Sequence, residues 1–307
     1  MDGKQMTTSI LNRSFSGPFL IGLAAFLWAT DALFRYPTIN SVDPTFVVFV
    51  EHLLAVLVMF PFIYFRYRKQ LFSLTAREWL AAAFCGVGGS AFAFVFFTAS
   101  FLYVNPSVSI LLQKLQPVMV VMIAYLFLGE RPAKKFYIWG SIALFAGIIL
   151  SFPDLNFKFI SDGVDLHSKG IQYAFFAALI WAASTVGGKI LVKRIPPVLA
   201  TFWRFFFGFV ALCILMFLAK DPISWTSLQS GTTLMSLAYI SLIPGLVAMI
   251  AYYSGLAQTT ASVTTFVELF YPIGAVLLNT IFLHTTLDVT QTVAGAILLI
   301  AVTLVSI

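Results

Sequence analysis

The sequence predicts an all-α membrane protein with ten transmembrane helices, arranged as two inverted five-helix repeats around a central cavity. The first observation is composition: 60% of the 307 residues are apolar, 10% are charged, and the mean hydropathy is +0.97. A chain this apolar exceeds what one globular core can bury, so lipid must solvate it. The second observation is a series of ten apolar runs, and the third is an internal repeat.

The repeat is visible as residue types that recur at a fixed distance. Residues 24–28 (AAFLW) return as residues 177–181 (AALIW), an offset of 153 residues. The same offset, or one of 155 residues further along, relates four more pairs: Pro44 and Pro197, Glu51 and Arg204, Pro117 and Pro272, Gly140 and Gly295. A duplicated apolar unit with charges at membrane depth is typical of a carrier that rocks about a central site.

Each predicted helix is an apolar run of about the 20 residues that a bilayer core requires. Polar or proline-marked breaks separate the runs, and Pro44, Pro106 and Pro197 stand near helix starts, where the missing N–H costs nothing. The first repeat gives spans 17–36, 44–65, 77–103, 107–128 and 136–152. The second gives 168–192, 197–219, 231–257, 262–284 and 288–307.

The loops predict the orientation. With a cytoplasmic N-terminus, the inner segments carry eleven Lys and Arg residues and the outer segments carry four. We therefore expect both termini in the cytoplasm, with residues 1–16 as a cytoplasmic tail and 153–167 as an external loop. Residues 1–16 are polar and no cleavage site follows the first run, which is expected to be a retained helix. Because each repeat (17–152 and 168–307) has five spans, the second is inverted.

The fourth run contains Gln116-Pro117 and closes with Leu128-Gly129-Glu130-Arg131. These residues, together with the segment 103–147, resemble the EamA family of the drug/metabolite transporter superfamily, and the likeness extends over nearly the whole chain. The resemblance implies ten helices, an inverted repeat, a central substrate cavity, and export or exchange of small metabolites, amino acids or related solutes. Glu130 is expected to have a structural role at the helix end.

Two features depart from the family pattern. Family members usually carry a basic residue in the second helix of each half, which Arg204 matches and Glu51 does not. The Leu-Gly-Glu ending is also lost in the second half, which reads Leu283-His284-Thr285. These departures concern the type of substrate and not the fold.

Five ionisable residues inside the predicted spans are candidates for the transport path. Each would cost at least about 2.5–3.5 kcal/mol at the bilayer centre, so it should face a protein interior or water. From their distances to the helix starts, Glu51 and Lys114 lie about 10 Å below the outer surface, level with Asp31. Arg204 and Glu268 lie about 9–10 Å above the inner surface. The sequence thus predicts two charged layers, each holding an acid and a base.

These charges have two interpretations. They line and gate a cavity, or Glu51–Lys114 and Arg204–Glu268 are static ion pairs that fix helix packing. Arg35 shares a helix face with Asp31 but lies near the outer surface, so we expect an interfacial anchor, as for Lys189 at an inner helix end.

Further candidates come from the repeat and from the polar residues nearby. Trp28 and Trp181 occupy equivalent places in helices that the resemblance puts at the cavity, although packing against lipid or core would also explain them. Gln113, the repeat counterpart of Glu268, and Tyr252 are expected to add hydrogen bonds. So are three other polar residues: Tyr253, Gln258 and Tyr271.

Several function classes are excluded or disfavoured. The net charge of +6 resides in short loops, which argues against nucleic-acid binding. No zinc-protease or nucleophile-elbow sequence is present, and the two Cys and three His show no metal-ligand spacing, so we expect no enzyme, no metal and no cofactor. A Walker sequence is also absent, so ATP is not the direct driver.

The sequence therefore predicts a secondary transporter of the cytoplasmic (inner) membrane that works by alternating access. Mixed charge in the cavity suits export of amino acids or related amphiphilic solutes. Alternatives are uptake or exchange of a nucleotide-like or cofactor-like metabolite, and multidrug efflux. Coupling is to protons, through Glu51, Glu268 or Asp31, or to the solute gradient alone. Small-residue stripes on the fifth and tenth helices allow a monomer or a homodimer.

Overall fold

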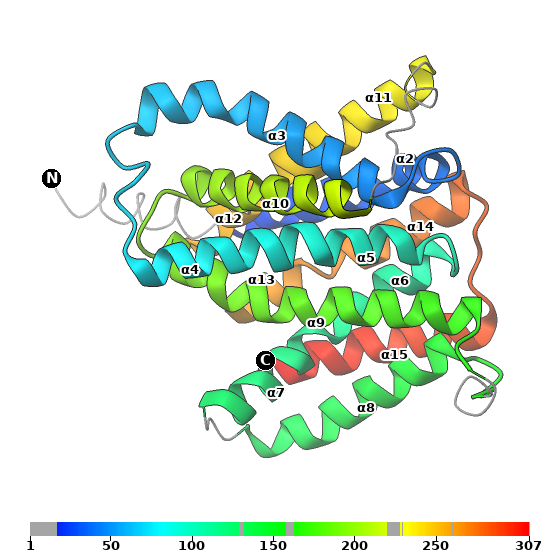
Figure 1. The fold of residues 1–307 in the computed structure, drawn as a ribbon. Helices are drawn as coiled ribbons and strands as arrows, with labels where there is room; N and C mark the ends of the chain where they lie inside the picture. The colour runs from blue at the N-terminus through cyan, green and yellow to red at the C-terminus, as the bar shows by residue number, and fades with distance from the viewer. Residues whose placement is uncertain are drawn as a thin grey trace, which may run out of the picture.

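The computed structural model describes residues 17–128, 132–157, 163–219, 228, 230–259 and 261–306. These residues form a bundle of roughly aligned helices, with no strand among them (Figure 1). Eight helices are long and apolar enough to cross a membrane, and two shorter apolar helices bring the number of spans to ten. The predicted fold class is therefore confirmed. Glu130 and its Gly129-Glu130-Arg131 motif lie outside the described residues.

The first repeat contains five spans. The first span is Gly17–Thr38, which ends in α2 (Asp31–Thr38), and the second is α3 (Pro44–Tyr67). The third comprises α4 (Ala76–Phe84), the π-helical segment η1 (Cys85–Phe92) and α5 (Ala93–Ser100). The fourth comprises α6 (Pro106–Leu112), the 3₁₀ turn η2 (Gln113–Leu115) and α7 (Gln116–Leu128), and the fifth is α8 (Lys134–Ser151).

The second repeat follows the same order. Its first two spans are α9 (Leu166–Val192) and α10 (Pro197–Ala219). The third comprises α11 (Gly231–Ile240), the π-helical segment η5 (Ser241–Val247) and α12 (Ala248–Leu256). The fourth is divided into α13 (Ala261–Val267) and α14 (Phe270–Phe282), and the fifth is α15 (Val289–Ser306).

Local side-chain chemistry explains where several helices begin. The Asp43 carboxylate accepts the N–H of Thr45 at the start of α3, and the Asn105 side chain accepts the N–H of Ser107 at the start of α6. In each case proline follows the capping residue, where its missing N–H is not needed. A capping box formed by Thr75 and Glu78 starts α4.

The irregular segments also follow the repeat. η1 and η5 occupy corresponding parts of the third and eighth spans, and η2 corresponds to the turn at Glu268 between α13 and α14. Proline explains η2 and the turn at Glu268. Pro117 and Pro272 have no N–H to donate to the carbonyls of Gln113 and Glu268, four residues earlier. The prediction of one continuous ninth run, 262–284, was therefore wrong in detail.

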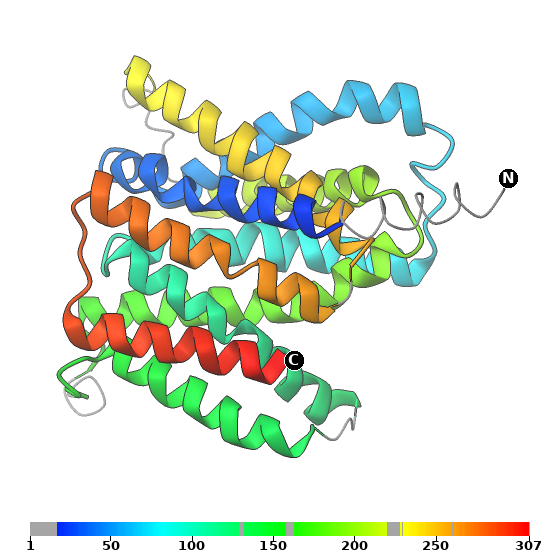
Figure 2. The ribbon, with the colours of Figure 1, turned by 180° about the vertical axis from the view of Figure 1, so that it is seen from behind.

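The two repeats run in opposite directions and interlock. The first span begins at the end of the bundle where its counterpart α9 finishes, as Figures 1 and 2 show from opposite sides. Helices of equivalent spans pack on each other across the repeat boundary: α3 on α10, α8 on α15, and, from the fourth and ninth spans, α6 on α14. We call the end carrying the loops 68–75 and 193–196 the basic end, after Arg68, Lys69, Lys193 and Arg194.

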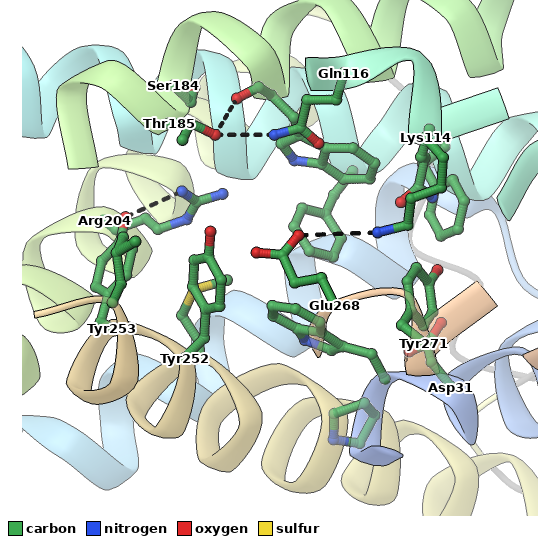
Figure 3. A pocket seen from close by; sticks show the side chains of 18 of the residues that line it. Asp31, Lys114, Gln116, Ser184, Thr185, Arg204, Tyr252, Tyr253, Glu268 and Tyr271 are labelled. Carbon is green, nitrogen blue, oxygen red and sulfur yellow. Dashed lines mark hydrogen bonds and ion pairs between the residues drawn. The ribbon is translucent and has the colours of Figure 1, made fainter. Parts of the chain in front are cut away.

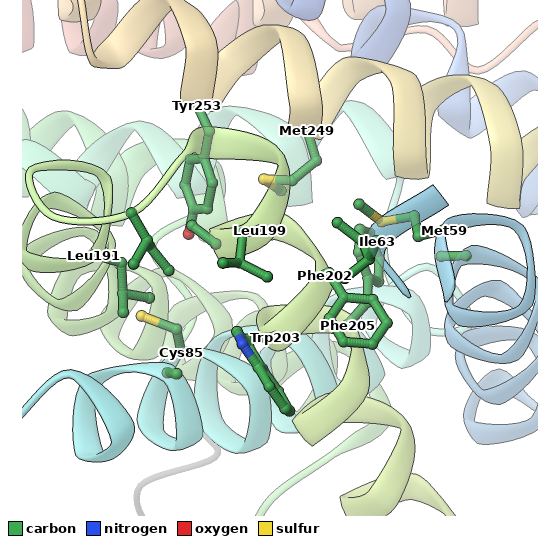
Figure 4. Packing of buried hydrophobic residues seen from close by; sticks show 14 of the residues in the cluster. Met59, Ile63, Cys85, Leu191, Leu199, Phe202, Trp203, Phe205, Met249 and Tyr253 are labelled. Atoms are coloured by element: carbon green, nitrogen blue, oxygen red, sulfur yellow. The ribbon is translucent and has the colours of Figure 1, made fainter. Parts of the chain in front are cut away.

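The largest buried cluster lies toward the basic end, between α3, α4, α10 and α12 (Figure 4). Met59, Ile63, Leu199, Phe202 and Met249 are among its members. Nearby, η1 approaches α10 at backbone distance: a Cβ on Gly86 would stand 2.8 Å from the Arg204 carbonyl oxygen. This close contact holds η1 against α10 and places its polar atoms beside the centre of the bundle.

Candidate functional site

A cavity of about 120 Å³ lies between the two repeats at the centre of the bundle (Figure 3). It is lined by residues from both repeats, including all nine predicted from sequence: Trp28, Asp31, Glu51, Gln113, Lys114, Trp181, Arg204, Tyr252 and Glu268. Tyr253 and Tyr271 also line it, whereas Gln258 does not and bonds instead to the carbonyl of Ser254.

Arg35 organises the side of the cavity away from the basic end. Its guanidinium binds Asp31 through two hydrogen bonds, Nε to Oδ2 at 2.6 Å and Nη2 to Oδ1 at 2.8 Å. Nη2 also donates to Glu51 Oε2 at 3.0 Å, and Nη1 donates to Thr98 Oγ1 at 3.1 Å. Arg35 therefore joins the first span to α3 and α5, and we call Asp31, Arg35 and Glu51 the Arg35 cluster.

The expectation that Arg35 is an interfacial anchor was wrong. The side chain is 1% exposed and points into the bundle, although it lies only three residues before the end of its helix at Thr38. Two carboxylates inside the bundle accept the guanidinium, so the charged group is stabilised without reaching the interface. For Lys189, which is half-buried near the end of α9, the anchor role stays a prediction.

Glu51 is only partly satisfied within this cluster. Its Oε2 accepts from Arg35, but Oε1 is buried and has no hydrogen-bond partner among the described residues. This oxygen faces η5, where a Cβ on Gly245 would stand 3.1 Å away. The neighbouring Pro244 has no N–H to donate. The Glu51 carboxylate therefore faces η5 at a point where the helix has one backbone N–H donor fewer.

Lys114 and Glu268 form the ion pair that crosses the cavity. Lys114 Nζ is 3.9 Å from Glu268 Oε2, and the same ammonium lies 5.1 Å from the centre of the Tyr271 ring (Figure 3). The pair joins η2 of one repeat to the matching break of the other. At 3.9 Å it is a loose contact, and both side chains are partly exposed to the cavity.

The ion pairs suggested by depth, Glu51–Lys114 and Arg204–Glu268, were both wrong. Glu51 binds Arg35 and Lys114 binds Glu268, because the break in each fourth span turns these last two side chains toward one another. No carboxylate among the described residues lies within ion-pair distance of Arg204. The predicted arrangement, in which an acid and a base pair within the outer layer and within the inner layer, is therefore not observed.

Arg204 is held by neutral acceptors instead. Its Nε donates to Ser90 Oγ at 2.8 Å, Nη2 donates to the Gly89 carbonyl at 2.9 Å, and Nη1 donates to Tyr253 Oη at 3.2 Å. These bonds use three of the five N–H donors of the guanidinium. No further hydrogen bond joins the Arg204 guanidinium to the described residues, and Arg204 lines the cavity. Arg204 is a positioned cation without a counter-ion among the residues that the structure describes.

The π-helical segment η1 supplies two of these acceptors, the carbonyl of Gly89 and the hydroxyl of Ser90. The Gly89 carbonyl accepts a second side-chain bond, from Trp181 Nε1 at 2.7 Å. π-Helical segments often occur at functional sites because they displace the backbone from its regular ladder. Here the displacement orients one cation and one indole toward the same space.

Aromatic rings form two walls of the cavity. Trp28 lies 5.1 Å from the Tyr252 ring and 6.1 Å from the Tyr271 ring, between ring centres. On the other wall, Trp181 lies 5.2 Å from Phe94 and 5.4 Å from Phe97. Trp28 and Trp181 are repeat counterparts, and each packs on rings of the opposite repeat, so each wall is built from both repeats.

Sequence reasoning missed several lining residues. Arg35, Phe94, Gln116 and Thr185 all border the cavity, and Gln116 Nε2 donates to Thr185 Oγ1 at 2.9 Å. For Arg35 the signal was present, since a base four residues after a buried acid can bind it on one helix face. For Gln116 and Thr185 the chain offered none, because their contact joins spans 69 residues apart.

The charged residues of the cavity balance. The carboxylates are Asp31, Glu51 and Glu268, and the cations are Arg35, Lys114 and Arg204. The site contains no group of three or more metal-ligand side chains among the described residues. Such an arrangement can bind an organic solute by aromatic contact and directed hydrogen bonds, with one guanidinium for a carbonyl or anionic group.

A model of the EamA-like transporter family matches residues 15–152 and 168–307 of this chain. The match confirms the resemblance noted in the sequence. Because both matched segments have five spans, the family pattern covers the chain twice.

Three relatives and one solved structure extend this finding. The riboflavin transporter ImpX of Fusobacterium nucleatum is 28% identical over 94% of this chain and 97% of its own length. An uncharacterized transporter of Clostridium kluyveri is 25% identical over 85% and 82%, and the uncharacterized inner membrane transporter YhbE of Escherichia coli is 22% identical over 58% and 56%. A crystal structure with a TM-score of 0.63 and 20% identity covers 94% of this chain and 96% of that chain, which shows the shared fold.

Proposed function

This chain belongs to the EamA-like transporter family and is a multi-pass membrane transporter, and we propose that its substrate is a planar, cofactor-like metabolite of the riboflavin kind. The observation that carries this proposal is the pair of aromatic walls around Trp28 and Trp181. Flat ring systems stack on such side chains, which contribute about 1–3 kcal/mol per stacked ring.

The polar groups of the cavity support the same class of substrate. A flavin ring is uncharged and carries carbonyl acceptors, which suit the free donors of Arg204. The balance of three acids and three bases favours a solute without large net charge. The similarity to a riboflavin transporter over 97% of its length agrees with this chemistry.

Export of amino acids, which the sequence favoured, is the second candidate. One observation supports it: a zwitterion could pair its carboxylate with Arg204 and its ammonium with Glu268. The aromatic walls would have little to contact in most amino acids, so we place the cofactor-like substrate first.

We propose that transport proceeds by alternating access between the two repeats, which the inverted arrangement supports. We also propose that the basic end faces the cytoplasm of a bacterial inner membrane, because Lys and Arg are enriched in loops on that side. Both termini would then be cytoplasmic. α8 packs on α15 within the chain, and Cβ atoms added to Gly147 and Gly295 would meet Leu115 and Leu111 of the same chain, which is compatible with a monomer.

The test is substrate exchange in reconstituted vesicles. Purified protein in vesicles loaded with riboflavin should accumulate labelled riboflavin from outside, and amino acids or cationic dyes should not compete. Exchange of amino acids without exchange of riboflavin would replace the first candidate by the second.

A matched pair of variants links the exchange to the aromatic wall. Trp28→Leu should weaken riboflavin binding by about 5- to 150-fold, the equivalent of one lost stacking contact. Trp139→Leu makes the same change on α8, outside the cavity, and should leave binding unchanged. Equal effects of the two variants would show that Trp28 does not contact the substrate.

A further inference from the structure

We propose that the Arg35 cluster is a proton-binding site, with Glu51 Oε1 as the atom that takes the proton, and that this proton couples a pH difference to transport. The inference rests on the proposed transport function and deepens it by assigning the coupling ion and its site. Sequence alone left Glu51, Glu268, Asp31 and an uncoupled mechanism open. The structure distinguishes these residues by their partners.

The first step is the charge of the cluster. Asp31 and Glu51 both bind one guanidinium, so the cluster holds two negative charges and one positive charge. Glu51 and Arg35 are each 1% exposed. A net negative charge at this depth is costly, and binding one proton removes it. Glu268 is different because Lys114 balances it one to one.

The second step is the choice between the two carboxylates. Both Asp31 oxygens accept from Arg35, at 2.6 and 2.8 Å, in a two-pronged arrangement that favours the ionised form. Glu51 has a single bond of 3.0 Å through Oε2, and Oε1 has no partner among the described residues. A proton on Oε1 therefore displaces no hydrogen bond.

The third step is the surroundings of Glu51. The first span contributes Asp31 and Arg35, and α10 contributes Arg204, which binds Ser90 and Gly89. From α5 comes Thr98, and η5 has no titratable side chain. Two further titratable groups are directed elsewhere: His52 Nδ1 contacts the Val48 carbonyl, and Tyr239 of α11 hydrogen-bonds with Thr30.

The consequence is mechanical as well as electrostatic. The bond between Arg35 and Glu51 links the first span to α3, and it is charge-assisted only while Glu51 is ionised. A proton taken from water onto Oε1 leaves a neutral acid and a weaker link. The spans can then separate at this end of the bundle, and the proton leaves when the link forms again. Proton binding thereby favours one of the two alternating states.

Proton binding can be measured without any substrate. Infrared difference spectra of the purified protein, recorded as the buffer is changed from weakly alkaline to weakly acidic, should show a protonated carboxyl band. The band should be absent in Glu51→Gln and present in Glu78→Gln, a control that changes a carboxylate of α4 outside the cavity. A band that persists in Glu51→Gln overturns the assignment of the proton to Glu51.

Coupling is measured in vesicles with riboflavin as the probe. In the wild type and in Glu78→Gln, a pH difference should drive net riboflavin movement. Glu51→Gln should lose this movement, and a thermal unfolding transition like that of the wild type shows that the variant is folded. Wild-type exchange without any response to a pH difference overturns the coupling. Absence of riboflavin exchange in the wild type overturns the proposed substrate, and the infrared result then decides the proton site separately.

Discussion

Glu51 and Arg204 are repeat counterparts, and each lies against the π-helical segment of the opposite repeat. Arg204 on α10 binds Gly89 and Ser90 of η1, while Glu51 on α3 faces Gly245 of η5. The backbone around the two sites is therefore related by the internal symmetry. The side chains have opposite charge.

The opposite charges of Glu51 and Arg204 determine which groups each side of the cavity can bind. A π-helical segment offers displaced carbonyls, which suit a guanidinium and not a carboxylate. Arg204 accordingly finds two of its acceptors on η1, the Gly89 carbonyl and the Ser90 hydroxyl, whereas Glu51 obtains its hydrogen bond from Arg35 on another helix. One half of the cavity thus presents a cation with free donors, and the other half presents an excess of negative charge.

Replacing Arg204 should impair both substrate binding and stability. Arg204→Gln removes the donors that border the cavity and leaves the Gly89 carbonyl with one bond fewer. Loss of a hydrogen bond to a charged group costs about 1.5–3 kcal/mol, so the thermal midpoint should fall and riboflavin affinity should drop at least about tenfold. Thermal unfolding and fluorescence titration measure the two effects.

Arg204→Lys separates charge from geometry in the same assay. A lysine keeps the positive charge but lacks the planar fork that reaches Ser90, Gly89 and Tyr253 together. We expect it to bind riboflavin as poorly as Arg204→Gln. Full affinity in Arg204→Lys would mean that the cavity needs a charge here and not directed donors.

Arg35 and Arg194 give a matched comparison of a buried and an exposed arginine. Arg35→Gln leaves Asp31 and Glu51 without a shared cation inside the bundle, which should cost about 3–5 kcal/mol of unfolding free energy. Arg194 is 76% exposed and 3.9 Å from Glu78, so Arg194→Gln should cost about 0–1 kcal/mol. Denaturant unfolding in detergent micelles tests both, and similar costs would contradict the role of Arg35 as a link between helices.

The contrast between these two arginines also shows what the sequence could predict. Hydropathy predicts the membrane spans, and the internal repeat predicts the symmetry between the two halves, because both depend on residue types at regular intervals. The depths of the charged residues were inferred from a constant rise per residue and stay a prediction. Arg35 was misassigned because its depth alone suggested an anchor, while its direction depended on a partner on α3, 16 residues away.

The ion pairs failed for a related reason. Whether Lys114 meets Glu51 or Glu268 depends on rotation about the helix axis, and the break at η2 changes that rotation. The nine candidate residues nevertheless surround one cavity, because polar groups in a membrane bundle have few other places to lie. Their roles in transport stay predictions.

The Lys114–Glu268 pair should behave as one unit. Lys114→Gln or Glu268→Gln alone leaves an unpaired charge beside the cavity, whereas the double variant removes both charges. In a double-mutant cycle on unfolding free energy, we expect a coupling of about 0.5–3 kcal/mol, with the double variant more stable than the sum of the two losses implies. Additive losses would show that the 3.9 Å contact is incidental.

A final prediction concerns the close packing that positions η1 beside α10. A Cβ on Gly208 would stand 2.6 Å from His52 Cδ2 and 3.0 Å from Ser90 Cβ. The His52 ring cannot move aside easily, because it packs between Phe94 and Phe205 at ring-centre distances of 6.3 and 5.1 Å. Gly208→Ala should therefore destabilise the protein by about 1–3 kcal/mol, the usual cost of overpacking, as measured by thermal unfolding.

Two variants make this prediction specific to the contact. Gly231 has nothing within 4 Å of an added Cβ, so Gly231→Ala should be neutral or slightly stabilising, since alanine favours a helix by about 1 kcal/mol over glycine. Combining Gly208→Ala with His52→Ala should recover part of the lost stability, because the smaller side chain vacates the space that the new methyl group needs. If the combined variant loses as much stability as the two single variants added together, the clash is not with His52. Ser90, whose hydroxyl binds Arg204, is then the next residue to replace by a smaller one.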